Sequence, residues 1–244
     1  MKVDEPPPRV VVWHDAECGS YDADLPFWRG LAAREPGPIL DVGAGTGRVA
    51  LDLAAHGHAV TALDRDPDLL ATLSRRAADR GLTVETVHAD AESFDLGPRR
   101  FGLILVPMQT IQLLGNRPAF LTAARRHARN AGLLAAALAD ALEGFSPGEA
   151  ILPAPDRAQH AGWSFASQPV AVRELDDRTV IERIRSTRAP DGRLTAEPDA
   201  IELARLDANG LEQEGRACGW RPEPSAIIEA TLEHVGSTVV LLRA

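Results

Sequence analysis

Acidic residues follow three short hydrophobic stretches of the chain, and the first of them opens a glycine-rich loop. The three acids are Asp41, Asp64 and Asp90. If the stretches are parallel strands, their carboxyl ends lie along one edge of a sheet, where open α/β sheets bind ligands. Carboxylates gathered there accept hydrogen bonds from hydroxyl or amine groups. An isolated aspartate more commonly caps a helix or a turn, but we expect these three together to line a ligand crevice.

The glycine-rich loop carries the most specific signal. One residue separates Asp41 from Gly43, and Gly45 and Gly47 follow at every second position. Glycines allow a tight turn and a close approach of ligand to backbone, and the helix that follows offers free N–H groups. A dinucleotide fingerprint would need its third glycine at the position of Arg48. The Asp41 carboxylate would repel a pyrophosphate but would suit an ammonium group, so the spacing disfavours a nicotinamide dinucleotide.

Hydrophobic runs alternate with helical patterns through the middle of the chain. We expect strands at 39–42, 59–63, 83–88, 101–106 and 133–139, and helices at 47–56, 66–80 and 117–130. Nearly all-apolar strands that alternate with helices predict a parallel sheet covered on both faces. Before them we expect a mobile, proline-rich arm at 1–12 and one or two helices within 13–33.

A looser two-residue alternation begins beyond residue 142. It predicts an antiparallel meander. We expect a loop at 145–156, strands at 163–175, 179–188 and 194–206, a helix at 207–218, and a closing hairpin of 227–234 and 237–242. The meander is therefore an insertion after the fifth parallel strand.

The composition narrows the classes of protein. The chain has 244 residues, 45% of them hydrophobic, and a formal net charge of −9. An acidic chain has no broad electrostatic attraction for nucleic acid or anionic lipid. The two cysteines, Cys18 and Cys218, form neither a disulfide framework nor a metal-ligand spacing. We expect a cytoplasmic protein with no membrane span, no signal peptide, no metal and no nucleic-acid partner.

Residues 13–142 and the C-terminal hairpin resemble the class I S-adenosylmethionine-dependent methyltransferases of the small-molecule type. The resemblance rests on the glycine loop and the three strand-end acids. It implies a Rossmann-like three-layer sandwich, with a seven-stranded, mainly parallel sheet whose last strand is antiparallel, plus an antiparallel β insertion. The implied domains are a helical lid at 1–36, a cofactor-binding core at 37–142 and 207–244, and an insertion over the acceptor pocket at 143–206.

The resemblance also implies roles for individual residues. The glycine loop would pack against the methionine and ribose of the cofactor, and Asp64 would accept both ribose hydroxyls. Asp90 would face the adenine amine, with the backbone N–H of Ala91 beside it. The implied cofactor-contacting residues are Tyr21, Asp41, Gly43, Ala44, Gly45, Gly47, Asp64, Arg65, Asp90, Ala91 and Pro107.

The acceptor side is less defined. Enzymes of this family that methylate base amino groups carry an acid or Asn, two prolines and an aromatic residue after the fourth strand. The segment that starts at Pro107 departs from that pattern, which argues against a nucleobase. In this segment Gln109 and Gln112 are candidates to bind an acceptor, although either could face solvent. The candidate catalytic residues are Tyr21, as part of a lid, His14, Gln109 and His234, with His160 as a further histidine.

The function that follows is transfer of a methyl group from S-adenosylmethionine to a small organic acceptor by in-line displacement, leaving S-adenosylhomocysteine. The acceptor atom (O, N, C or S), the need for a general base, and the choice between monomer and homodimer stay open, and a peptide acceptor is compatible. A protein that binds the cofactor without transferring the methyl group is the main alternative. A nicotinamide-dependent oxidoreductase is less favoured.

The basic run 125–129 is most simply a solvated helix face.

Overall fold

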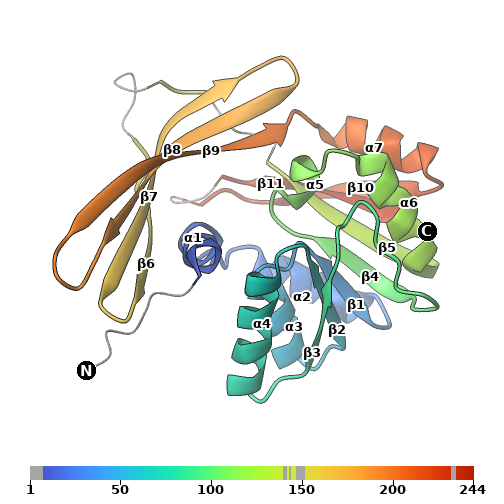
Figure 1. Ribbon diagram of the computed structural model, residues 1–244. Helices are drawn as coiled ribbons and strands as arrows, with labels where there is room; N and C mark the ends of the chain where they lie inside the picture. The colour runs from blue at the N-terminus through green and yellow to red at the C-terminus, as the bar shows by residue number, and fades with distance from the viewer. Residues whose placement is uncertain (1–7, 140–141, 143, 147–151, 232–234) are drawn as a thin grey trace. The chain divides into compact units, whose positions relative to one another are not determined.

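The computed structural model describes residues 8–139, 142, 144–146, 152–231 and 235–244, and the chain divides into two compact units (Figure 1). The larger unit comprises Asp22–Ala141 and Leu206–Ala244, and the smaller unit comprises Met1–Tyr21 and Leu142–Arg205. Within the described ranges, every helix is too short or too polar to cross a lipid bilayer.

The larger unit is built on a seven-stranded sheet in the order β10-β11-β5-β4-β1-β2-β3. Neighbours among β1 to β5 run parallel, whereas β11 is antiparallel to both β5 and β10. The strands are β1 Ile39–Val42, β2 Val60–Asp64, β3 Val84–His88, β4 Phe101–Val106, β5 Ala128–Leu138, β10 Arg221–Ile228 and β11 Ser237–Arg243. This topology confirms the predicted mainly parallel sheet with an antiparallel last strand.

Helices cover both faces of this sheet, as the apolar strands predicted (Figure 1). In β1, Ile39 packs on the side of α2, α3 and α4, whereas Leu40 packs on the side of α5, α6 and α7. The helices are α2 Leu25–Arg34, α3 Arg48–Ala55, α4 Pro67–Asp79, α5 Thr110–Leu113, α6 Arg117–His127 and α7 Ala208–Ala217. Because side chains alternate along a strand, Asp41 lies on the face of α3.

Two boundaries in the larger unit differ from the sequence expectation. The helix expected at 117–130 ends at His127, and β5 begins at once with Ala128. The closing hairpin uses β10 rather than 227–234, of which 232–234 lie outside the described residues. Strand β10 contains prolines at positions 222 and 224, which it tolerates because it is an edge strand, where a missing N–H leaves no neighbour unpaired.

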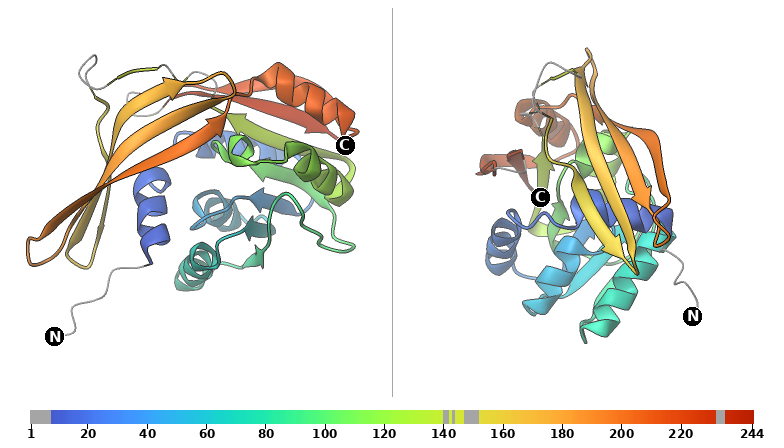
Figure 2. Two further views of the ribbon diagram at one scale, coloured as in Figure 1. Left: turned by 45° about the horizontal axis from the view of Figure 1, so that its top comes forward. Right: turned by 90° about the vertical axis from the view of Figure 1, so that its left-hand side faces the viewer.

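The smaller unit is a four-stranded antiparallel sheet in the order β6-β7-β8-β9, with one helix packed on it. Figure 2 shows its strands as a long twisted sheet. The elements are α1 Arg9–Cys18, β6 Asp156–His160, β7 Trp163–Glu174, β8 Arg178–Arg188 and β9 Leu194–Ala204. The three predicted strands are confirmed, and β6 is an additional strand that the loop expected at 145–156 did not anticipate.

Helix α1 corrects the expectation of an arm at 1–12, because its first turns are helical and bury Val11 and Val12. Trp13 meets the ring of Phe165 edge-on, with the ring centroids 5.7 Å apart. An ionic contact closes the interface: Glu17 of α1 accepts a hydrogen bond of 2.8 Å from Arg185 of β8. These apolar and charged contacts keep α1 on the sheet of its own unit.

Two glycines of the larger unit offer a direct test of this packing. A methyl group at Gly102 in β4 would overlap the backbone carbonyl of Pro36, whereas one at Gly30 in α2 would meet nothing within 4 Å. We expect Gly102→Ala to lower the free energy of unfolding by about 1–3 kcal/mol. Gly30→Ala, the matched control, is expected to raise it by about 0.5–1 kcal/mol, because alanine favours the helix. Urea unfolding measures both; equal effects would contradict the packing described for β4.

Candidate functional site

The loop at 43–47 joins β1 to α3 and is fastened to the neighbouring strand. The backbone N–H groups of Gly43 and Ala44 both donate to the carbonyl oxygen of Leu63 in β2, at 2.8 and 3.1 Å. Gly43 has a φ of 71°, and a Cβ there would lie 2.6 Å from the Thr110 side chain. A glycine is therefore required at this position both by the backbone conformation and by the lack of space.

Asp64, the last residue of β2, is fixed against this loop. Its side chain is buried, and its two oxygens accept hydrogen bonds from the backbone N–H groups of Gly45 and Asp66, at 2.8 and 2.9 Å. A carboxylate oxygen can accept more than one hydrogen bond. Asp64 is thus held in a defined position beside the loop while it keeps acceptor capacity for a ligand.

Asp41 of β1 is a buried carboxyl group whose charge is compensated only in part. Its residue is 1% exposed, and neither side-chain oxygen has a hydrogen-bond partner in the described structure. Burial, together with the nearby carboxylates of Asp64 and Asp24, raises the pKa of Asp41 to about 7, although the positive charge of Arg48 and the backbone of Ala50 act in the opposite direction. The site therefore penalises the negative charge of Asp41 until a positive charge arrives.

Arg48 has its own acidic partner, which the sequence did not reveal. Its guanidinium pairs with the carboxylate of Asp24 through both terminal nitrogens, and the Trp28 indole N–H donates to the same carboxylate at 2.7 Å. Asp24 and Arg48 are both buried. Because Arg48 is paired with Asp24, the positive charge of Arg48 is shared between Asp24 and Asp41. Asp24 precedes α2 and would be taken for a helix cap from the sequence alone; its pairing across the fold is visible only in three dimensions.

Asp90 and Ala91 follow β3 at the same edge of the sheet. Asp64 pairs in register with His88, so Asp90 lies two residues beyond the end of the neighbouring strand. Asp90 is exposed, and one of its oxygens accepts the backbone N–H of Glu92 at 2.8 Å. Ala91 is buried. The structure thus brings the three predicted acids to one edge, with Asp41 and Asp64 buried and Asp90 open to solvent.

The turn from β4 to α5 completes this edge. Met108 has a φ of 55°, a left-handed conformation that is rare for residues other than glycine and that costs of the order of 1–3 kcal/mol. The Gln112 side chain anchors the turn, since it accepts the backbone N–H of Ala139 at 2.8 Å. Gln109 is half-buried, and its amide forms no hydrogen bond within the described part of the chain. The turn therefore presents one polar side chain that the fold does not use.

The remaining candidates lie in the smaller unit or outside the described residues. His14 lies in α1 and Tyr21 is buried at the end of the same unit's N-terminal segment, so both belong to the smaller unit. His160 is exposed in β6, and His234 lies outside the described residues. The lid and catalytic roles of Tyr21, His14 and His234 stay predictions.

Comparison with known proteins agrees with this geometry. Residues 39–132 match a family described as a methyltransferase domain. An uncharacterized methyltransferase of Bacillus subtilis, YodH, is 33% identical over 92 residues, which cover 36% of this chain and 40% of that protein. The matches thus span less than half the length of the curated relatives.

Solved structures resemble nearly the whole chain. The sugar N-methyltransferase KedS8 from a Streptoalloteichus species is 19% identical, with a TM-score of 0.71 over 95% of this chain and 92% of that one. CalS10, an amino pentose methyltransferase from Micromonospora echinaspora, is 20% identical, with a TM-score of 0.68 over 95% and 96%. At these identities the likeness concerns the fold. Residues 39–132 thus match a methyltransferase-domain family, and the chain shares the fold of these enzymes, in agreement with the resemblance on which the glycine loop was interpreted.

The raised pKa of Asp41 makes stability depend on pH. The ordinary value is 3.8, and the folded value is about 7, so between these values the folded protein holds a proton that the unfolded chain has lost. The contribution of Asp41 to stability therefore falls as the pH rises from about 4 to 7, by an amount of the order of 4 kcal/mol. We expect Asp41→Asn to remove this loss.

The measurement is urea unfolding of both proteins at about pH 5 and about pH 8, with the difference between the two proteins as the readout. The advantage of Asp41→Asn over the unchanged protein should be larger at the higher pH. A difference that is the same at both pH values would show that Asp41 is compensated in the folded protein.

Proposed function

We propose that the protein transfers a methyl group from S-adenosylmethionine to a small organic acceptor. The observation that carries this proposal is the buried and only partly compensated Asp41 at the head of the glycine loop. S-adenosylmethionine supplies an electrophilic methyl group on a positively charged sulfur, together with an ammonium group, a carboxylate and a nucleoside. The residues at the strand edge fit the cationic groups and the nucleoside.

Charge balance supports a cationic ligand. The carboxyl groups near Asp41 outnumber the cations: Asp24 and Asp64 raise its pKa, and Arg48 is the positive charge that lowers it. Burial disfavours leaving the excess negative charge unpaired. The ammonium and sulfonium groups of the cofactor outnumber its single carboxylate. A diphosphate would add negative charge to the same loop. We therefore propose that Asp41 is the residue that favours the cationic cofactor and disfavours a dinucleotide.

The remaining edge residues account for the nucleoside. Asp64 is held by two backbone N–H groups with acceptor capacity to spare, which suits the two adjacent hydroxyls of a ribose. Asp90 and Ala91 lie beyond the neighbouring strand, where the adenine edge is expected. The left-handed turn at Gly43 gives the loop the conformation in which we place the methionine part beside it. What these residues do is to bind and orient, which accounts for most of the catalysis in such a displacement.

We propose an amino group as the acceptor, oriented by Gln109. A neutral amide can direct the lone pair of an acceptor but cannot take its proton, so it suits an amine that arrives unprotonated rather than an alcohol that needs a base. The strained Met108 and the anchored Gln112 hold the Gln109 backbone on either side. Two proteins of similar fold, a sugar N-methyltransferase and an amino pentose methyltransferase, support an amine on a small molecule as the acceptor.

Replacing Asp64 tests the cofactor assignment. We expect Asp64→Ala to weaken binding of S-adenosylmethionine by about tenfold or more, because charge-assisted hydrogen bonds to the ribose are lost. Isothermal titration calorimetry measures the affinity. Asp79→Ala, an exposed site at the end of α4, removes the same charge and should leave the affinity unchanged. If Asp64→Ala binds as tightly as this control, the ribose does not lie at the end of β2.

Replacing Gln109 tests the acceptor side separately. Transfer of labelled methyl from the cofactor is measured on a panel of amino sugars and on the matched sugars that carry hydroxyls only. We expect label on the amines, and we expect Gln109→Ala to reduce the rate by about tenfold to a hundredfold through lost orientation. The affinity for the cofactor should not change.

Two outcomes would contradict this assignment. Unchanged transfer by Gln109→Ala would show that another group orients the acceptor. Tight cofactor binding with no label on any acceptor would favour the non-catalytic alternative.

A further inference from the structure

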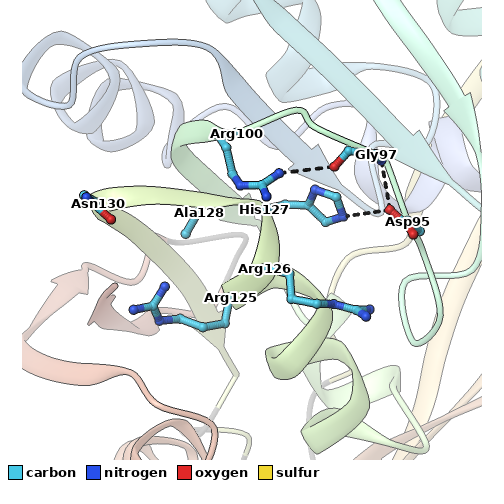
Figure 3. Close-up of a pocket in the computed structure, with 8 residues that line it drawn as sticks. All are labelled: Asp95, Gly97, Arg100, Arg125, Arg126, His127, Ala128 and Asn130. Carbon is cyan, nitrogen blue, oxygen red and sulfur yellow. Dashed lines mark hydrogen bonds and ion pairs between the residues drawn. The ribbon is translucent and has the colours of Figure 1, made fainter.

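A hollow lies on the larger unit, at the sheet edge opposite the glycine loop. It has a volume of about 520 Å³, within the range of ~300–1,000 Å³ that is typical of small-molecule sites. The glycine loop follows the carboxyl end of β1, whereas this hollow is formed where β4 and β5 begin. Its lining residues are Asp95, Gly97, Arg100, Arg125, Arg126, His127, Ala128 and Asn130 (Figure 3).

Two of the arginines in this hollow are held in place by neutral groups. Arg100 donates to the backbone carbonyl oxygens of Gly97 and Arg99, at 3.1 and 2.8 Å. Arg125 donates to the carbonyl oxygen of Gly219 at 3.2 Å, and its guanidinium lies 5.7 Å from the centroid of the Trp220 ring. Carbonyls and a ring position these guanidinium groups without neutralising them. The cations are therefore ordered in advance, which lowers the entropy cost of binding an anion.

The third arginine, Arg126, is exposed and has no acidic partner among the described residues. Figure 3 shows Arg100 on one side of His127, with Arg125 and Arg126 on the other. The positive charges thus border the hollow from two separate segments, the chain before β4 and the last turn of α6. A solvated helix face would account for Arg125 and Arg126 but not for Arg100, which lies on the other segment.

His127 fixes these two segments to each other. Its ring is buried; the backbone N–H of Leu96 lies 3.1 Å from Nε2, and the carbonyl oxygen of Arg99 lies 3.0 Å from Nδ1. An N–H can only donate and a carbonyl can only accept, so Nε2 is the acceptor and Nδ1 carries the hydrogen. His127 is therefore neutral in this arrangement, and its 3.7 Å approach to Asp95 is not an ion pair.

The charges in the hollow do not cancel. The lining contains three arginines and one carboxylate, that of Asp95, whose side chain is 76% exposed and accepts the backbone N–H of Gly97. The carboxyl end of α6 adds about half a negative charge, so a surplus of roughly one and a half positive charges is left. Guanidinium groups form bidentate hydrogen bonds with phosphate oxygens. We propose that this hollow binds a phosphoryl group, free or carried by a small organic molecule.

The test is calorimetric titration of the full chain, at low ionic strength, with inorganic phosphate and with glycerol phosphate. We expect both probes to bind, and the double variant Arg100→Gln/Arg126→Gln to bind about tenfold more weakly. The control, Arg75→Gln/Arg80→Gln, removes two exposed positive charges from α4 and its C-terminal cap, and should bind like the unchanged protein. Tighter binding of glycerol phosphate than of phosphate would assign the site to an organic phosphate, and equal binding to the free ion.

Two results would overturn the proposal: no binding of either probe, or an equal loss of affinity in the control variant, which would indicate attraction by overall charge. If the double variant does not fold, Arg126→Gln alone replaces it, because that guanidinium forms no hydrogen bond within the described chain. Neither variant touches the glycine loop or Gln109, so the outcome is independent of the proposed methyl transfer.

Discussion

A carboxyl group buried without a partner is the constraint on which the cofactor site depends. Asp41 lies inside β1, between β4 and β2, where a hydrophobic residue would stabilise the sheet at no electrostatic cost. The same strand end carries a left-handed glycine turn, and Asp64 is fastened to that turn by its backbone. Removing Asp41 from water is unfavourable in the isolated protein and becomes favourable when a cation binds. The fold thus retains at its centre a carboxyl group whose charge Arg48 compensates only in part.

The pairing of Arg48 with Asp24 leaves the site with an excess of negative charge. If Arg48 were unpaired, it would neutralise Asp41 and the loop would not discriminate between a cation and an anion. Because Asp24 engages Arg48 through two nitrogens, and Trp28 orients Asp24, the guanidinium is already committed. The excess negative charge is therefore a property of the folded core, which explains why a glycine-rich loop that resembles a phosphate-binding loop is suited to a cationic cofactor.

The sequence predicted the features that follow from local pattern. Apolar strands between helices predicted the parallel sheet, and the spacing from Asp41 to Gly47 predicted the kind of loop. The pairing of Asp24 with Arg48 could not be predicted, because it joins residues 24 positions apart that local preference treats as a cap and a solvated base. Strand β10 was misplaced because its prolines suit only an edge, and edges are a property of the assembled sheet. Helix α1 was missed at its start because Val12 is buried against a sheet that lies far along the chain.

Proton release on cofactor binding tests the central claim most directly. Near pH 7 Asp41 is about half protonated in the free protein, and a bound cation favours its charged form. Calorimetric titration with S-adenosylmethionine in buffers of different ionisation enthalpy should therefore report release of about half a proton, and Asp41→Asn should abolish it. Binding enthalpies that do not depend on the buffer, with the cofactor bound normally, would show that Asp41 does not respond to the charge of the ligand and would contradict the account.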